Sequence, residues 1–75
     1  MKEHDSVILT VDLPAEGLAT GDIGTIVHVH QGGKGYEVEF MTLDGETVAV
    51  STLLANQVRP IARGEIAHAR SLAAA

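Results

Sequence analysis

Two histidines, His28 and His30, stand two residues apart in a β-branched stretch, and Glu37 and Glu39 repeat that spacing a few positions later. Residues two apart in a strand share one face, so each pair presents both side chains on the same side of a sheet. Imidazole and carboxylate groups bind zinc, which needs three or four ligands, and histidine titrates near neutral pH. We favour a simpler interpretation, an exposed cross-strand set of weak electrostatic effect. A metal- or ligand-binding site stays as a distant alternative.

No other residues form a pattern typical of catalysis or cofactor binding. The glycine-rich run 32–35 lacks the serine or threonine of a phosphate loop and precedes a strand, so a turn with positive φ explains it better. Alternating acidic residues such as Glu37, Glu39 and Glu46 indicate a solvated strand face, without the cleft that shifts catalytic pKa values. No serine lies beside a histidine–acid pattern. We predict no catalytic residue, no cofactor and no enzyme activity.

The length and composition indicate one small domain. A chain of 75 residues buries only about 60% of the surface that its unfolded form exposes. It has no cysteine, which removes disulfides and thiolate metal sites and fits a reducing compartment. The first residues are polar, and no apolar run approaches the roughly 20 residues of a membrane span. We therefore expect a cytoplasmic protein without a membrane partner.

The charge balance bears on the choice of partner. Ten acidic and five basic residues give a formal net charge of −5, which repels the phosphate backbone of a nucleic acid. The only aromatic residues, Tyr36 and Phe40, are too few for a base-stacking platform. We expect no nucleic-acid partner. The same acidity favours a basic protein as the partner.

Alternation of apolar and polar residues dominates the chain from residue 6 to residue 61 and predicts strands. The predicted strands are 6–11, 23–30, 36–41, 46–53 and 58–61. In the second of them, Val27 and Val29 should face the core while His28 and His30 face outward. Two registers with the third strand remain open: His28 opposite Glu37, or His28 opposite Glu39 with His30 opposite Glu37. A one-residue slip would mix the two faces and is excluded.

The order of strands and loops indicates the fold class. A long loop at 12–22, tight later hairpins and a short last strand are typical of an SH3-like barrel. The main competitor, the OB-fold, usually places a helix between its third and fourth strands, and the segment between Phe40 and Val48 is too short for one. We predict an all-β fold, a small five-stranded SH3-like barrel over residues 1–61.

Residues 62–75 differ in character, because they are rich in alanine and lack strand alternation. Ile66, Ala69 and Ala73 recur at helical spacing with Leu72 beside them, which predicts a short C-terminal helix, or else a disordered tail. A helix of this length is marginal in water, so it would need to pack against its own barrel or against another molecule. We therefore predict these four residues as a candidate interaction surface that could join copies of the chain.

Several sequence motifs are similar to those of one protein family. They lie at 13–18, 21–27, 36–40, 44–45 and 58–60, and include Gly-Asp-x-Gly-Thr and Glu-Val-Glu-Phe. On these motifs, residues 5–61 resemble the bacterial family called domain of unknown function 4926. The resemblance implies an SH3-like barrel and assigns no catalytic residue. It also implies an inhibitor or immunity-type role in a mobile or toxin-associated gene neighbourhood.

These observations lead to two functional hypotheses. The first is a non-catalytic protein–protein interaction module, which binds its partner through the acidic outer surface, including the His28/Glu37 face, or through an open strand edge. The second is a self-assembling structural subunit whose contacts are made by the C-terminal helix.

Overall fold

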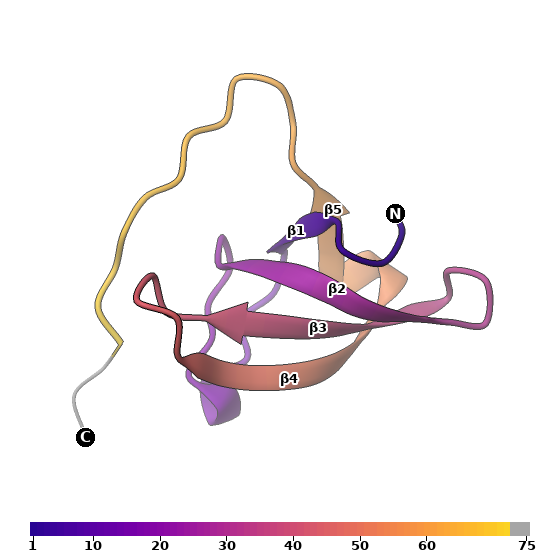
Figure 1. Ribbon diagram of the computed structural model, residues 1–75, viewed down its shortest axis with the longest axis horizontal. Coiled ribbons are helices and arrows are strands. Elements are labelled where there is room, and N and C mark those ends of the chain that lie inside the picture. Colours follow the sequence, from indigo (N-terminus) through magenta and orange to yellow (C-terminus); the bar gives the residue numbers. More distant parts are fainter. Residues whose placement is uncertain (73–75) are drawn as a thin grey trace.

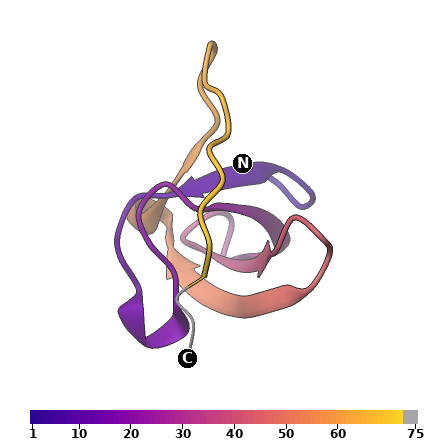
Figure 2. The ribbon, with the colours of Figure 1, turned by 90° about the vertical axis from the view of Figure 1, so that its left-hand side faces the viewer.

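The computed structural model describes residues 1–72, and they form one antiparallel sheet of five strands in the order β4-β3-β2-β1-β5 (Figure 1). The strands are β1 (Ser6–Leu9), β2 (Ile23–His30), β3 (Gly35–Met41), β4 (Thr47–Leu54) and β5 (Val58–Pro60). Two 3₁₀ turns, η1 (Pro14–Glu16) and η2 (Ala55–Gln57), lie in the connections. The predicted all-β class and the five strands are confirmed. The sheet is curved but open, since no ladder joins its edge strands β4 and β5 within residues 1–72 (Figure 2).

The core lies inside the curve of the sheet. Val7, Leu9, Ile26 and Val38 are the largest side chains that are fully buried. Leu18 adds to them from the long loop between β1 and β2. That loop is held by paired backbone hydrogen bonds between Leu13 and Leu18 at 2.9 and 3.1 Å. These bonds close the loop on itself, and the buried Leu18 side chain anchors it to the core.

The β2–β3 hairpin explains the glycine-rich run. Gln31, Gly32 and Gly33 all have positive φ angles, of 48°, 67° and 105°. The backbone N–H groups of Gly33 and Lys34 both donate to the His30 carbonyl, at 3.0 and 3.1 Å. Since glycine adopts this backbone conformation without a Cβ clash, the run forms a turn, as predicted.

The register between β2 and β3 contains a bulge. His28 lies opposite Glu37 and Val29 opposite Tyr36, which is one of the two registers predicted. The pairing then shifts between Ile26 and His28, and Ile26 lies opposite Val38. Ile26 is fully buried while Val27 is 41% exposed. The prediction that Val27 faces the core is therefore wrong, because a bulge inserts one extra residue and reverses the faces beyond it.

The C-terminal segment is an extended arm, and the predicted C-terminal helix is wrong. After β5 the chain runs away from the sheet and returns beside the loop that precedes β2 (Figures 1 and 2). Residues 61–72 are exposed, so no apolar face is buried that could stabilise a helix of marginal length. Within residues 1–72, no helix is long and apolar enough to cross a membrane.

A clamp at the start of the arm sets its direction. The Arg59 guanidinium donates to both oxygens of Glu65 at 2.8 and 2.6 Å, and the Ala62 N–H donates to Glu65 Oε1 at 2.6 Å. These hydrogen bonds, chiefly those from Arg59, lower the pKa of Glu65 to about 2. Gly64, with φ of 83°, turns the chain between Ala62 and Glu65. We call residues 66–72, which follow this clamp, the tail.

Candidate functional site

The predicted histidine and glutamate residues lie on the outer surface of β2 and β3. His30 Nε2 is 3.1 Å from Glu37 Oε1, and the Thr52 hydroxyl donates to the same oxygen. His28 Nδ1 is 3.8 Å from Glu3 Oε1, and the two histidine rings meet edge to face at 4.7 Å. The Thr52 hydroxyl, followed by His30, holds the pKa of Glu37 below its usual value. Of the four predicted residues, His28, His30 and Glu37 are thus neighbours.

Glu39 does not join them. Its Oε2 accepts a hydrogen bond from the Thr47 hydroxyl at 2.7 Å, further along the sheet. Among the residues that the structure describes, no three His, Asp or Glu side chains are placed to hold a metal ion. The cluster around His30 has the geometry of an exposed cross-strand pair, whose contribution to stability is small.

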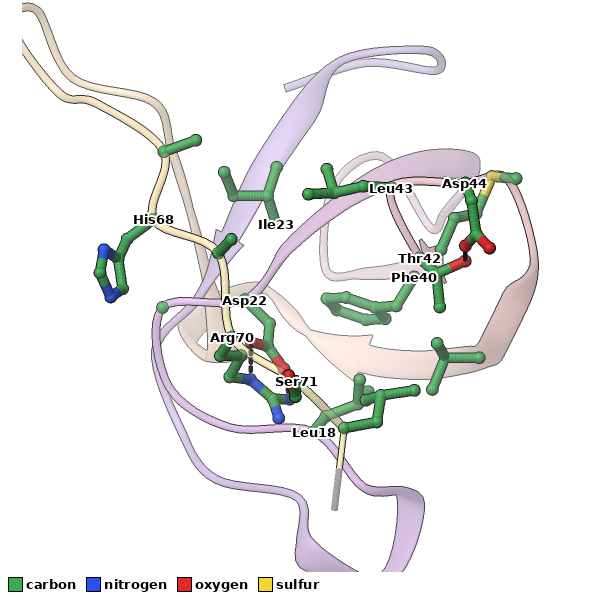
Figure 3. Close-up of a pocket in the computed structure, with 16 residues that line it drawn as sticks. Leu18, Asp22, Ile23, Phe40, Thr42, Leu43, Asp44, His68, Arg70 and Ser71 are labelled. Carbon is green, nitrogen blue, oxygen red and sulfur yellow. Dashed lines mark hydrogen bonds and ion pairs between the residues drawn. The ribbon is translucent and has the colours of Figure 1, made fainter. Parts of the chain in front are cut away.

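A cleft of about 680 Å³ lies at the other end of β2, between the sheet and the tail (Figure 3). Leu18 and Phe40 belong to the core and line it from below. Three large apolar side chains at its rim are exposed to solvent: Ile23, Met41 and Leu43, the last of these 94% exposed. The tail forms the opposite wall from Ala67 to Leu72. An apolar rim of this kind is typical of a binding surface.

An ion pair joins the tail to the sheet beside this cleft (Figure 3). Arg70 Nε donates to Asp22 Oδ1 at 2.7 Å, and Arg70 Nη2 donates to Asp22 Oδ2 at 2.5 Å. The same Nη2 donates to the Gly17 carbonyl at 3.0 Å. Two parallel hydrogen bonds between a guanidinium and a carboxylate are strong and directional. The Asp22 side chain is 17% exposed and the Arg70 side chain 38%, so water still reaches the arginine side of the pair.

The loop holds the Asp22 carboxylate in position. The Ala19 N–H donates to Asp22 Oδ2 at 2.8 Å, and the Asp22 N–H donates to the Ala19 carbonyl at 3.0 Å. The backbone around Asp22 is joined to β1, because Leu9 N–H donates to the Asp22 carbonyl and Gly21 N–H to the Leu9 carbonyl, both at 2.8 Å. The loop thus fixes the carboxylate by contacts that do not involve the tail.

The ion pair gives a testable pH dependence. The Arg70 guanidinium holds the pKa of Asp22 below its usual value, against the opposing effect of partial burial. The pair therefore contributes fully above the usual carboxyl pKa of about 4 and is lost as pH falls through the lower value of the folded state. Arg70→Ala is expected to raise the pKa of Asp22, as measured by carboxyl-detected NMR titration.

A second carboxyl serves as the control for that titration. The pKa of Asp5 is lowered by hydrogen bonds from the Lys2 ammonium group and the Lys2 N–H, and neither Arg70 nor Asp22 is among its causes. It should be the same in the wild type and in Arg70→Ala. An Asp22 pKa that did not respond to the substitution would show that the guanidinium does not occupy this position in solution.

The C-terminal residues that we predicted as one interaction surface lie in different surroundings. Ala69 and Leu72 line the cleft, whereas Ile66 is 93% exposed. Ala73 lies outside the described residues. Sequence reasoning missed Asp22 and Leu43 as site residues. Two signals could have indicated this site: Arg70 is the one arginine in the alanine-rich tail, and Leu43 is the one apolar residue in an otherwise polar turn.

Comparison with known proteins gives a family and no closer relative. No curated protein and no solved structure matched the chain. The model of the family described as Domain of unknown function (DUF4926) matches residues 3–60. This range includes Gly17, Asp22 and Leu43, and it ends before Arg70. Because the match covers most of the chain, the protein belongs to the DUF4926 family.

Proposed function

We propose that this chain is a non-catalytic protein-interaction module, and that its partner binds at the cleft beside Asp22. One observation carries the proposal: large apolar side chains stand exposed around a cleft, next to a carboxylate that already holds an arginine. Binding sites combine an apolar surface with a few well-placed polar groups. The cleft has both, whereas a single exposed large apolar side chain, Leu54, lines the surface around His30.

The assignment of the fold to the SH3-like barrels is part of this proposal. The strand order, with β5 beside β1 and β4 at the far edge, and the long first loop both support it. In such a barrel the seam between β4 and β5 stays open. The proposed site is formed mainly by the loops at the start of β2 and the end of β3, and Val48 of the edge strand β4 also lines it.

The charge of the chain supports a basic partner. The net charge of −5 attracts cationic surfaces at long range, which raises association rates more than it raises affinity. The Asp22 carboxylate supplies a specific anchor for one cation at short range. An inhibitor or immunity-type role would follow directly if the module covered a functional basic segment of its partner.

Two matched leucine variants test this proposal. Leu43 and Leu54 are both exposed, at 94% and 63%, but Leu43 lies at the cleft and Leu54 at the opposite end of β4. Neither Leu43→Gln nor Leu54→Gln should change the melting temperature by more than a few degrees. In quantitative affinity purification from the native host, Leu43→Gln should reduce capture of the specific partner by about tenfold or more, as expected for loss of a contact at the centre of an interface.

Leu54→Gln should retain the same protein at the level of the wild type. Equal capture by all three baits would contradict the proposal, as would equal losses with the two variants. A wild-type bait that retained no protein above the level of Leu43→Gln would contradict it as well.

A further inference from the structure

We infer that the Asp22 site is a receptor for an extended segment of a partner protein that carries an arginine followed, two residues later, by an apolar residue, and that the chain's own tail is its tethered occupant. This inference rests on the proposed function, because it uses the same cleft. It names the chemistry of the ligand and the competitor that the ligand must displace.

The acceptors fit a guanidinium. Asp22 offers two oxygens to Nε and Nη2 of Arg70, and the Gly17 carbonyl accepts a further hydrogen bond from Nη2. The planar guanidinium presents its donors in a fixed fork, whereas the ammonium group of lysine is a point charge that cannot match two parallel acceptors. The site should therefore select arginine over lysine.

The receptor and its occupant belong to different parts of the chain. Gly17 and Asp22 lie within the matched family domain, and Arg70 lies beyond its end at residue 60. The Asp22 carboxylate is fixed by the Ala19 N–H and by the backbone joined to β1, so it does not depend on Arg70 for its position. A preformed acceptor set of this kind can accept an arginine from another chain without rearrangement of the loop.

The tail shows how such a segment would lie. Among the described residues 66–72, Arg70 alone forms hydrogen bonds to the sheet or its loops. Leu72, two residues further, lines the apolar cleft together with Leu18 and Ile23. Every residue from Ala67 to Leu72 lines the cleft, and Leu72 is the largest apolar side chain among them. The site therefore recognises an arginine and the apolar residue two positions after it.

The contacts of the tail are weak enough to be displaced. The Arg70 side chain remains 38% exposed, and an ion pair that water still reaches contributes little net stability. The tether raises the local concentration of the tail to the millimolar range, as short flexible linkers do. A partner must compete with that concentration, so the tail lowers the apparent affinity of the site in proportion to its occupancy.

The test uses the full-length chain carrying Arg70→Ala, in which the tail can no longer occupy the site. The probe is a synthetic peptide of residues 66–72 with blocked ends, and the readout is the set of amide NMR signals of Gly17, Ala19 and Asp22. We expect the peptide to shift these signals in Arg70→Ala. The same shift should need at least about tenfold more peptide in the wild type, where the tail competes. Adding Asp22→Asn to Arg70→Ala should abolish the response, because a charge-assisted pair is lost.

Two control peptides isolate the role of the guanidinium. Citrulline in place of the arginine keeps the shape and removes the charge, and lysine keeps the charge and removes the fork. Both should bind at least about tenfold more weakly. Equal binding of the citrulline peptide, no effect of Asp22→Asn, or identical signals for Gly17, Ala19 and Asp22 in the wild type and Arg70→Ala would overturn the inference.

The same experiment separates the inference from the proposed function and from self-association. If Leu43→Gln abolishes partner capture but the peptide does not bind, the proposed function stands and the ligand chemistry is wrong. If the peptide binds and Leu43→Gln has no effect on capture, the ligand chemistry stands and the proposed function is wrong. Signals of Gly17, Ala19 and Asp22 that move with wild-type concentration alone would identify the occupant as the tail of a second copy, which would overturn the assignment to a different partner protein.

Discussion

Replacing Gly24 by alanine is expected to lower the free energy of unfolding by about 3 kcal/mol, the upper part of the range for overpacked cores. A Cβ atom at this position would lie 2.5 Å from Val38 Cγ1 and 2.9 Å from Phe40 Cε1. Val38 is fully buried and stiff about χ1, so it cannot turn away. The φ angle of Gly24 is not positive, so alanine gains about 0.4–1 kcal/mol from the restricted unfolded chain. That gain is smaller than the cost of the clash.

Urea unfolding followed by circular dichroism measures this loss, and the melting temperature should fall by roughly 12–24 °C for a domain of this size. The double variant Gly24→Ala/Val38→Ala is the control, since it removes the nearest clashing atom. Val38→Ala alone should cost about 2 kcal/mol through the cavity that it leaves. The double variant should lose about 1 kcal/mol less than the sum of the two single losses. Strict additivity would contradict the assignment of the clash to Val38.

The strands could be predicted from the sequence because their signal is local. In β3 the apolar residues Tyr36, Val38 and Phe40 stand at every second position and are buried. The observed bounds of β3 and β4 differ from the predicted ones by at most one residue at each end. Pro60 is a further local signal, since proline cannot donate to a ladder and therefore indicates an edge strand. It lies opposite Val7 in β5, at one end of the sheet.

The site at the cleft could not be predicted in the same way, because it depends on one contact between distant residues. Asp22 and Arg70 are 48 positions apart, and neither stands in a repeating pattern. Arg70 was equally consistent with the C-terminal end of a helix, where a cation is favourable. The extended arm follows from the clamp between Arg59 and Glu65 and from the ion pair with Asp22. Both are side-chain contacts that alanine spacing does not reveal.

The histidine cluster shows both the strength and the limit of strand periodicity. Spacing by two correctly placed His30 and Glu37 on one face, where they lie within 3.1 Å. It could not determine that Glu39 would pair with Thr47, nor that the ladder would shift by one residue before His28. A bulge leaves no regular mark in a run of β-branched residues, because either neighbour can fill the core equally well.

The bulge in β2 therefore makes a sharp prediction about two adjacent residues. Ile26→Ala is expected to lower the free energy of unfolding by about 3–4 kcal/mol, since it empties a fully buried position against Val38. Val27→Ala should cost less than about 1 kcal/mol, because the Val27 side chain is 41% exposed and only strand propensity is lost. Urea unfolding of both variants, with equal m-values, measures the difference. Simple alternation from His28 and His30 predicts the opposite order, so a larger loss for Val27→Ala would place Val27 in the core and remove the bulge.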